Sequence, residues 1–442
     1  MIPASSSIRP QNLPAEVLCA IFAYLVPIYP INKGRPTLGW AFVTHVCGHW
    51  RSIAIEHSAL WTTLHTDYFA AWDVFRQRAN GLPLTIVDSD GFHRINEDEL
   101  VRVLLPILSS AKSVTLRSSD YMTPDFLEHL EKCELINDLT VCSFYPGINS
   151  TSLPRLSTSL RSLRTHDILF PWTFQARDLR HLELTMHREI LTEWGVPYES
   201  KFVDVLATLD SMRSLEQLVL SYVIPSAWTL TDATKRRIAL PRLRGLTLRD
   251  HSRSCATLWS LLDFPADASV LIDFRSAFLG SDQEMLLVTE SLMARFSSAR
   301  GIIPIYPRVR VEKTQEPWQL NPLSGTLLFD MGHEEDCISA TGAGHAGVSP
   351  SGKPVICLRM PIYVGIYGIH DAQLDWREFL AITRKLLEAI PTDMFEVLTV
   401  VVSDHTKVKR EGVFQHATVE ERPIIVEDSS ALYFIEDQDS TT

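Results

Sequence analysis

Hydrophobic residues recur at helical spacing in the first segment of the chain. The apolar positions lie at i, i+1, i+4, i+5 and i+8, which is one continuous face of a helix. They are Val17, Leu18, Ile21, Phe22 and Leu25. Asn12 and Pro14 are typical of a helix start, and Pro27 and Pro30 predict that the helix ends there and opens a loop.

A second apolar stripe predicts a second helix from about Leu38 to Glu56. The stripe consists of Val43, Val46, Cys47, Trp50, Ile53 and Ala54. Two helices of this size cannot enclose Phe22, Trp50 and Trp61 without a third element. We therefore expect part of this apolar surface to contact a partner protein, while Phe22 and Ile53 pack into the core of the domain itself.

Two motifs in these helices resemble the F-box, the docking module of Skp–cullin–F-box ubiquitin ligases. They are Leu-Pro-x-Glu-Val-Leu, which begins at Leu13, and Val-Cys-x-x-Trp-Arg, which begins at Val46. The resemblance covers residues 10–64, although the loop at 26–37 is several residues longer than in a compact F-box. The connector that follows, at 65–83, resembles that of large fungal F-box families that continue into leucine-rich repeats.

The resemblance implies that the helices bind a Skp-type adaptor and, through it, a cullin. The adaptor-facing residues that it implies are Leu13, Pro14, Val17, Leu18, Ile21, Leu25, Val43, Val46, Cys47 and Trp50. The alternative for each is that the side chain packs the core of the domain itself. We favour the interface for Leu13, Pro14, Leu18 and Val46.

Short leucine-rich segments recur after residue 84 at gaps of roughly 20 to 36 residues, which bracket the period of leucine-rich repeats. They lie at residues 113–116, 139–142, 160–163, 179–184, 215–220 and 243–248. The last three share Leu-x-x-Leu-x-Leu, a pattern typical of a turn that runs into a short strand. Helices that return between strands are predicted at 100–108, 126–135 and 202–212.

The predicted fold class is therefore α/β: an N-terminal helical F-box followed by an irregular leucine-rich-repeat solenoid, a parallel strand ladder with covering helices. An α/β sheet with irregular crossovers is the alternative, because the asparagine ladder of regular repeats is absent. Beyond residue 300, strands are predicted at 318–330, 355–360 and 395–403, and Asp375 begins a predicted helix that ends before Pro391. This helix and the strand after it repeat the same unit.

The predicted domain organisation has five parts. They are a disordered N-terminus at 1–9, the F-box at 10–64, a connector helix at 65–83, a leucine-rich-repeat-like domain at 84–435 with a long glycine-rich loop at 332–354, and a disordered tail at 436–442.

The composition limits which kinds of partner we expect and in which cellular compartment we expect the protein. The 442 residues are 45% hydrophobic and 21% charged, which is typical of a globular protein, and the net charge of −12 argues against a nucleic-acid partner. No apolar run is long enough to cross a membrane, and the first residues do not spell a secretory signal. Seven cysteines without paired spacing indicate reduced thiols, so we expect a cytoplasmic or nuclear protein.

The chemical motifs in the sequence are weak. The segment 342–353 spells both Gly-x-Gly-x-x-Gly and Gly-x-x-x-x-Gly-Lys, but Pro350 and Pro354 exclude the helix that phosphate binding requires. The run His333–Cys337 holds adjacent metal-ligand types that cannot converge on one ion. We therefore expect no catalytic residue, no cofactor and no metal.

Three functions remain open. The first is a substrate receptor that presents a target protein for ubiquitination, and the second is an F-box scaffold without that role. The third, from another class, is a nucleotide-binding enzyme that uses the loop at 342–353. Five arginines could form a basic patch suited to a phosphorylated target, with simple surface solvation as the alternative: Arg161, Arg164, Arg177, Arg180 and Arg188.

Overall fold

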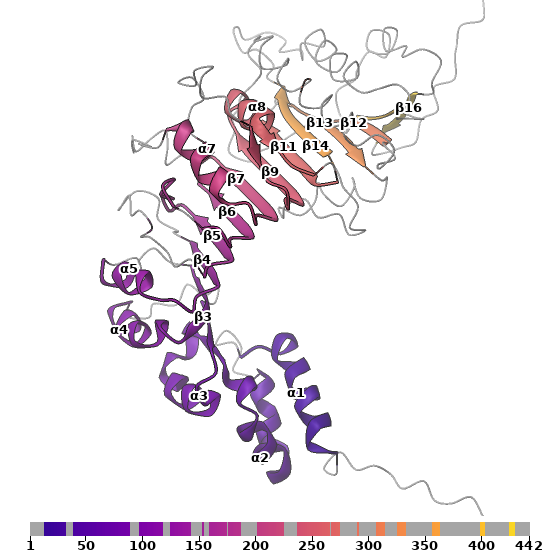
Figure 1. Cartoon of the computed structure of the whole chain (residues 1–442). Coiled ribbons are helices and arrows are strands. Elements are labelled where there is room, and N and C mark those ends of the chain that lie inside the picture. Colours follow the sequence, from indigo (N-terminus) through magenta and orange to yellow (C-terminus); the bar gives the residue numbers. More distant parts are fainter. Residues whose placement is uncertain are drawn as a thin grey trace, which may run out of the picture. The chain divides into compact units, whose positions relative to one another are not determined.

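The structure is a computed structural model (Figure 1). It describes residues 13–31, 39–88, 97–117, 124–142, 153, 159–174, 176–186, 201–224, 237–265, 267–274 and 290, together with the backbone of five strands at 306–313, 325–332, 356–362, 398–402 and 424–428. The chain divides into two compact units, Met1–Leu179 and Arg180–Thr442, and each is described by itself.

The N-terminal unit begins with helices and continues into alternating strands and helices. Its helical elements are α1 (Ala15–Ile28), η2 (Gly39–His45), α2 (Gly48–Glu56), η3 (Ser58–Trp61), η4 (Thr66–Ala71), α3 (Trp72–Ala79), α4 (Glu97–Leu108) and α5 (Pro124–Glu131). Its strands are β1 (Thr63–His65), β2 (Leu84–Val87), β3 (Ala111–Leu116), β4 (Asp138–Cys142) and β5 (Ser162–His166).

Helix α1 ends at Ile28, between Pro27 and Pro30, which confirms the end predicted from the two prolines. Proline disturbs a helix most at interior positions, where it removes a hydrogen bond from the middle of the ladder. Here Pro27 lies in the last turn, and the backbone N–H of Tyr29 still closes that turn on the carbonyl of Leu25 at 2.8 Å.

The predicted single helix over 38–56 is wrong, because the segment forms η2 and α2 with a break between them. The backbone of Cys47 is extended, with φ −160° and ψ 170°, and it begins α2 as the N-cap residue. The Arg51 Nε–H donates to the carbonyl of Thr44 at 2.7 Å, which ties the two helices together across the break. Val46 therefore precedes α2 instead of sharing a helical face with Trp50.

Trp61 is the centre of the helical core. Its ring lies 5.0 Å from that of Trp40 and 5.0 Å from that of Phe75, both in edge-on contact. The Nε1–H of Trp61 donates to the carbonyl of Ala54 at 2.8 Å, so the buried indole has its hydrogen-bond partner. This cluster joins η2, α2, η3 and α3 into one folded region.

The strands of the N-terminal unit pair in parallel in the order β1-β2-β3-β4-β5. The register aligns one apolar residue from each strand: Leu64, Ile86, Val114, Leu139 and Leu163, all at most 1% exposed. The parallel ladder is thus confirmed at the predicted strands. The ladder starts earlier than predicted, however, because β1 lies before residue 84. The connector at 65–83, predicted as one helix, consists of η4 and α3.

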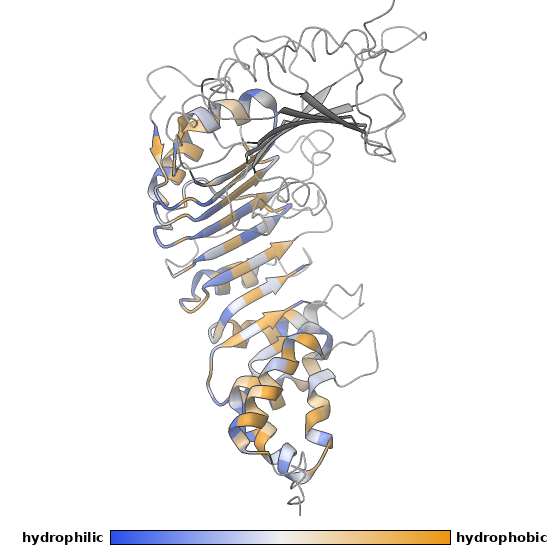
Figure 2. Cartoon of the chain, turned by 90° about the vertical axis from the view of Figure 1, so that its right-hand side faces the viewer, coloured by the Kyte–Doolittle hydropathy of each residue, from blue (hydrophilic) through white to orange (hydrophobic). Residues whose placement is uncertain are grey.

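The helices α4 and α5, predicted to return between strands, pack against each other on one side of these strands (Figure 1). Hydrophobic and polar residues alternate along each strand (Figure 2). This alternation places one row of side chains in the core and the other on the opposite face of the sheet.

The C-terminal unit continues the alternation of strands and helices. Its strands are β6 (His181–Thr185), β7 (Gln217–Ser221), β8 (Ile238–Ala239), β9 (Gly245–Asp250), β10 (Leu262–Asp263), β11 (Ser269–Phe274), β12 (Tyr306–Lys313), β13 (Gly325–Gly332), β14 (Ile356–Ile362), β15 (Leu398–Val402) and β16 (Ile424–Asp428). Its helices include α7 (Phe202–Ser211), which was predicted, and α8 (Ser252–Leu261), which was not.

The main sheet of this unit has the order β6-β7-β9-β11-β14-β13-β12-β15-β16. Parallel pairing aligns Leu182, Leu218 and Leu246 in one row. The strands predicted at 318–330, 355–360 and 395–403 correspond to β13, β14 and β15. Strand β13 is antiparallel to both β12 and β14, whereas β15 is parallel to β12 and β16. The predicted helix from Asp375 and the tail at 436–442 lie outside the described residues.

Aspartates at strand ends hold neighbouring loops through hydrogen bonds to their carboxylates. The Asp88 carboxylate, directly after β2, accepts the Thr66 hydroxyl at 2.6 Å and the backbone N–H of Arg117 at 2.9 Å. In the other unit, Asp250 of β9 accepts the backbone N–H of Ile224 at 2.9 Å. Each carboxylate therefore satisfies backbone donors that the strand ladder leaves free.

Candidate docking surface

The apolar face of helix α1 is wider than the part that the core of the domain buries. At 100° per residue, Leu18, Phe22 and Leu25 lie within about 60° of one another on the helical wheel. Val17, Ile21, Tyr24 and Ile28 lie within the adjoining 60° or so, which extends the arc to about 160° in total. Glu16 is the one charged residue of the helix, so the remaining face is also poor in charge.

The first part of this arc is the part that the domain buries. Leu18 and Phe22 are both 0% exposed, and the Phe22 ring lies 5.4 Å from that of Trp50. Val43 of η2 is also buried, at 5% exposed. The prediction that Phe22 and Ile53 belong to the core is confirmed.

Leu18 and Val43 need a correction, because both were expected to face an adaptor. Their side chains lie inside the folded domain, where they are not accessible to a partner. The periodicity of α1 could not reveal this, since a buried leucine and a docking leucine satisfy the same helical pattern.

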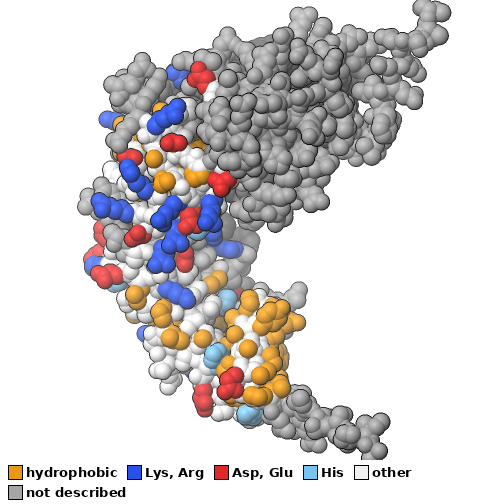
Figure 3. Space-filling view, turned by 45° about the vertical axis from the view of Figure 1, so that its right-hand side comes forward, with side chains coloured by type: hydrophobic (Ala, Val, Ile, Leu, Met, Phe, Trp, Pro, Cys, Tyr) orange, Lys and Arg blue, Asp and Glu red, His pale blue; other side chains and the backbone are white. Residues whose placement is uncertain are grey.

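The second part of the arc is exposed and continues onto η2. We call the following residues the docking surface: Val17, Ile21, Tyr24, Ile28, Tyr29, Phe42 and Val46. They make up seven of the eleven large hydrophobic residues that are exposed in the described part of the chain. Tyr24 is 71% exposed and Val46 59%, and the hydrophobic side chains form a continuous area over this end of the domain (Figure 3).

The remaining predicted residues differ in their exposure. Leu13, Leu25, Cys47 and Trp50 are half-buried, and Pro14 is exposed. His49 Nε2 lies 3.4 Å from the Leu13 carbonyl oxygen, a contact that joins the start of α1 to α2. No group of three metal-ligand side chains occurs among the described residues.

Sequence reasoning missed Tyr24, Ile28, Tyr29 and Phe42. For Tyr24 and Ile28 the signal was available, because they follow Val17 and Ile21 on the same side of the helix at i+7. Exposed tyrosines are typical of protein interfaces, because the ring supplies contact area and the hydroxyl supplies a hydrogen bond.

Charge is scarce around the docking surface. Within residues 13–31 and 39–56, Glu16, Arg51 and Glu56 are the only aspartate, glutamate, lysine or arginine residues. Exposed apolar patches with so little charge are characteristic of sites where another protein binds.

Comparison with known proteins agrees with this geometry. Residues 10–67 match a family model described as F-box-like. This segment is an F-box-like domain. The match confirms the resemblance seen in the sequence for residues 10–64, and F-box domains in general bind Skp-type adaptors. No curated protein and no solved structure matches the chain.

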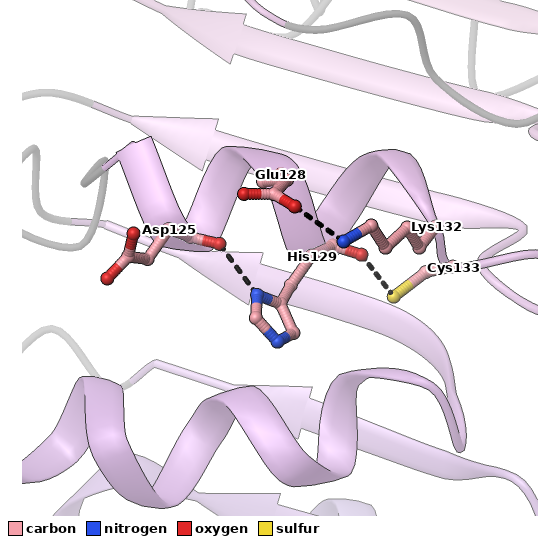
Figure 4. Close-up of polar contacts among 5 residues, drawn as sticks. All are labelled: Asp125, Glu128, His129, Lys132 and Cys133. Carbon is pink, nitrogen blue, oxygen red and sulfur yellow. Dashed lines mark hydrogen bonds and ion pairs between the residues drawn. The ribbon is translucent and has the colours of Figure 1, made fainter.

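Outside the F-box-like domain, helix α5 and the residues directly after it carry the residue types of a catalytic triad. Asp125, His129 and Cys133 follow one another at i, i+4 and i+8 (Figure 4). The His129 ring contacts the backbone carbonyl of Asp125 at 2.8 Å, and the Cys133 thiol donates to the carbonyl of His129 at 3.1 Å.

These contacts are those of a stable helix and not of a nucleophile. The side chains do not bond to one another, and burial raises the pKa of the Cys133 thiol, so it is protonated at neutral pH. Lys132, directly after α5, donates to Glu128 of that helix at 2.6 Å, and both side chains are exposed.

The described residues cover the other chemical candidates only in part. Arg161, Arg164 and Arg177 are exposed in the N-terminal unit, whereas Arg180, in the other unit, pairs with Glu216 at 3.5 Å. Arg188, the segment His333–Cys337 and the loop at 342–353 lie outside the described residues. Among the described helices, none is long and apolar enough to cross a membrane.

Proposed function

We propose that this protein is a substrate receptor of a Skp–cullin–F-box ubiquitin ligase. The F-box-like domain would bind a Skp-type adaptor through the docking surface, and the sheet that follows would hold a target protein. The observation that carries the proposal is the concentration of exposed hydrophobic residues on α1 and η2 of a domain that matches the F-box-like model.

The contact residues that we propose differ from those expected from the sequence. Val17, Ile21 and Val46 stay in the set, and Tyr24 and Phe42 join it because their side chains are exposed beside them. Leu18 and Val43 support the surface from within, because they hold α1 and η2 in place. Burying such a surface against an adaptor would stabilise the complex by roughly 25 cal/mol for each Å² of apolar area removed from water.

The sheet supports the reading of the rest of the chain as an irregular leucine-rich-repeat array. Leucines occupy equivalent register positions in β6, β7 and β9, helices follow several of the strands, and aspartates hold the strand ends. Repeats of this kind cannot bury their apolar face alone, and stacking provides the core. Their opposite face is then available for a target.

The mechanism that we propose is tethering, without chemistry by this chain. A target held on the sheet and an adaptor held on α1 belong to one assembly, so the encounter between the target and the ubiquitin-charged enzyme becomes intramolecular. Such linkage raises the effective concentration of the reactants to about the millimolar range for short connections. No residue of this chain acts as a catalyst in this proposal.

Co-purification with a Skp-type adaptor tests the docking step. We expect Val46→Asp and Ile21→Asp to abolish adaptor recovery, because each places a charge in an apolar interface. Val203→Asp is the matched control, since Val203 is an exposed valine of α7, at 44%, outside the F-box-like domain. Equal recovery of all three variants would contradict adaptor docking at this surface.

A reconstituted ligase tests the receptor step. Addition of cullin and a ubiquitin-charged enzyme should lead to ubiquitination of a captured target with the wild-type chain and not with Val46→Asp. Adaptor binding without ubiquitination of any captured protein would instead favour the scaffold role.

A further inference from the structure

A pocket of about 390 Å³ lies where the F-box-like domain meets the connector formed by η4 and α3. Its apolar wall includes Ile55, Trp61 and Phe75. The volume falls within the range of roughly 300 to 1,000 Å³ that is usual for small-molecule sites. The pocket shares no residue with the docking surface, so it needs a separate explanation.

The polar side of the pocket is cationic. Arg51, Arg78 and His45 contribute to its lining, and none of the described residues that line it is an aspartate or glutamate. Among the described residues, neither guanidinium has a carboxylate partner. Arg76, in the same helix as Arg78, does have a carboxylate partner, because it pairs with Asp73 at 3.6 Å.

Both arginines are held in place by contacts that leave donors free. The guanidinium carbon of Arg78 lies 4.2 Å from the centroid of the Trp61 ring, a cation–π contact. Arg51 uses its Nε–H for the carbonyl of Thr44 at 2.7 Å. A guanidinium carries five N–H donors in a planar fork, so several remain for a carboxylate.

We propose that this pocket binds a small organic anion that has an apolar, preferably aromatic, body and one carboxylate. The body would lie against Ile55 and Phe75, which are half-buried, and the carboxylate would accept hydrogen bonds from Arg51 and Arg78. A bare inorganic anion would leave the apolar wall in contact with water. A neutral apolar ligand would desolvate the two cations without compensation.

Titration calorimetry on the full chain tests this proposal with 4-phenylbutyrate and its neutral amide as probes. We expect the carboxylate to bind and the amide to bind about tenfold more weakly, since a charge-assisted hydrogen bond is worth about 1.5 kcal/mol or more. Absence of carboxylate binding at millimolar concentration, or equal affinity for the two probes, would overturn the proposal.

Two pairs of variants locate the site. Ala71→Phe fills the pocket from its wall and should abolish binding, whereas Ala70→Phe, at the exposed neighbour, should not. Arg78→Gln should weaken the carboxylate about tenfold, whereas Arg76→Gln should leave its affinity unchanged. If Ala71→Phe does not fold, the arginine pair still decides, and wild-type affinity in Arg78→Gln would refute the assigned role of the guanidinium.

Discussion

In the F-box-like domain, Ile21 and Tyr24 expose 37% and 71% of their side chains, whereas Leu182, Leu218 and Leu246 in the sheet expose at most 1%. Both regions are rich in hydrophobic residues. The sheet covers its own leucines, because each strand places a row of them against the rows of its neighbours and against a covering helix. The helical domain does not cover all of its apolar residues. The apolar arc of α1 extends from the buried side of the helix onto its exposed side.

This difference separates two uses of the same residue types. In the sheet, the leucines are buried by folding, and in our proposal the polar face is the one that recognises a target. In the F-box-like domain, Leu18 and Phe22 are buried in the core and the adjoining residues are exposed. We propose that these exposed residues bind another chain. The following experiments test where that division lies.

The largest effect is expected from replacing neighbouring residues of α1 that fall on different sides of the division. Leu18→Ala should lower the free energy of unfolding by about 2 to 5 kcal/mol, because it leaves a cavity at a fully buried position. Ile21→Ala should lower it by about 1 kcal/mol or less. Chemical denaturation measures both, and equal losses would show that the two residues share one environment.

The next largest effect concerns binding instead of stability. The double variant Ile21→Ala with Tyr24→Ala should weaken adaptor binding by at least about 2 kcal/mol, or roughly 30-fold, because aromatic and aliphatic side chains at the centre of an interface carry much of its energy. Val203→Ala serves as the exposed control. Unchanged affinity, measured by calorimetry, would remove α1 from the interface.

A third test asks whether the Asp88 carboxylate stabilises the end of strand β2. Asp88→Ala should destabilise the N-terminal unit by about 1 to 3 kcal/mol, because the Thr66 hydroxyl and the Arg117 N–H would lose their acceptor. Asp73→Ala, at a side chain that is 96% exposed, is the control and should have little effect on the melting temperature. A melting temperature of Asp88→Ala equal to that of the control would show that this carboxylate does not hold the ladder.

The smallest effect is a pH dependence in the C-terminal unit. Burial, with a smaller effect of Asp250 and Asp273, raises the pKa of the Cys255 thiol well above its usual value of 9.0. The folded chain therefore keeps this proton in a range where the unfolded chain releases it. Stability should be unaffected below pH 9 and should fall as the pH rises above it.

Thermal unfolding between pH 8 and pH 10.5 measures this fall. It should be shallower in Cys255→Ala than in the wild type, whereas Cys19→Ala, at a half-exposed thiol, should follow the wild type. Identical pH profiles for all three proteins would contradict the assignment.

The sequence predicted much of the fold, and the reasons for its failures are physical. The strands β3 to β7 and β9 were predicted correctly, because leucines that alternate with polar residues are typical of a half-buried strand. The break at Cys47 was missed because the helical spacing continues across it, and the extended backbone there depends on contacts such as that of Arg51 with Thr44. Strand β1, with three residues, is too short to carry a pattern of its own.

The candidate site was predicted as a region but not as a set of residues. Helical periodicity located the apolar arc of α1, but it could not divide Leu18 from Ile21, because that division depends on where Trp50 and η2 pack. The pocket beside Trp61 could not be predicted from any sequence pattern, because its lining residues lie in separate segments between Ile31 and Arg78 that only the fold brings together.

Hydrogen–deuterium exchange of the full chain, with and without a Skp-type adaptor, tests the central claim most directly. We predict slower amide exchange in peptides that cover residues 15–28 and 39–46 when the adaptor is present, with no change in peptides that cover residues 181–185 and 217–221. Protection confined to the strands, or no protection anywhere at saturating adaptor, would contradict the assignment of the exposed face of α1 and η2 as the surface that binds it.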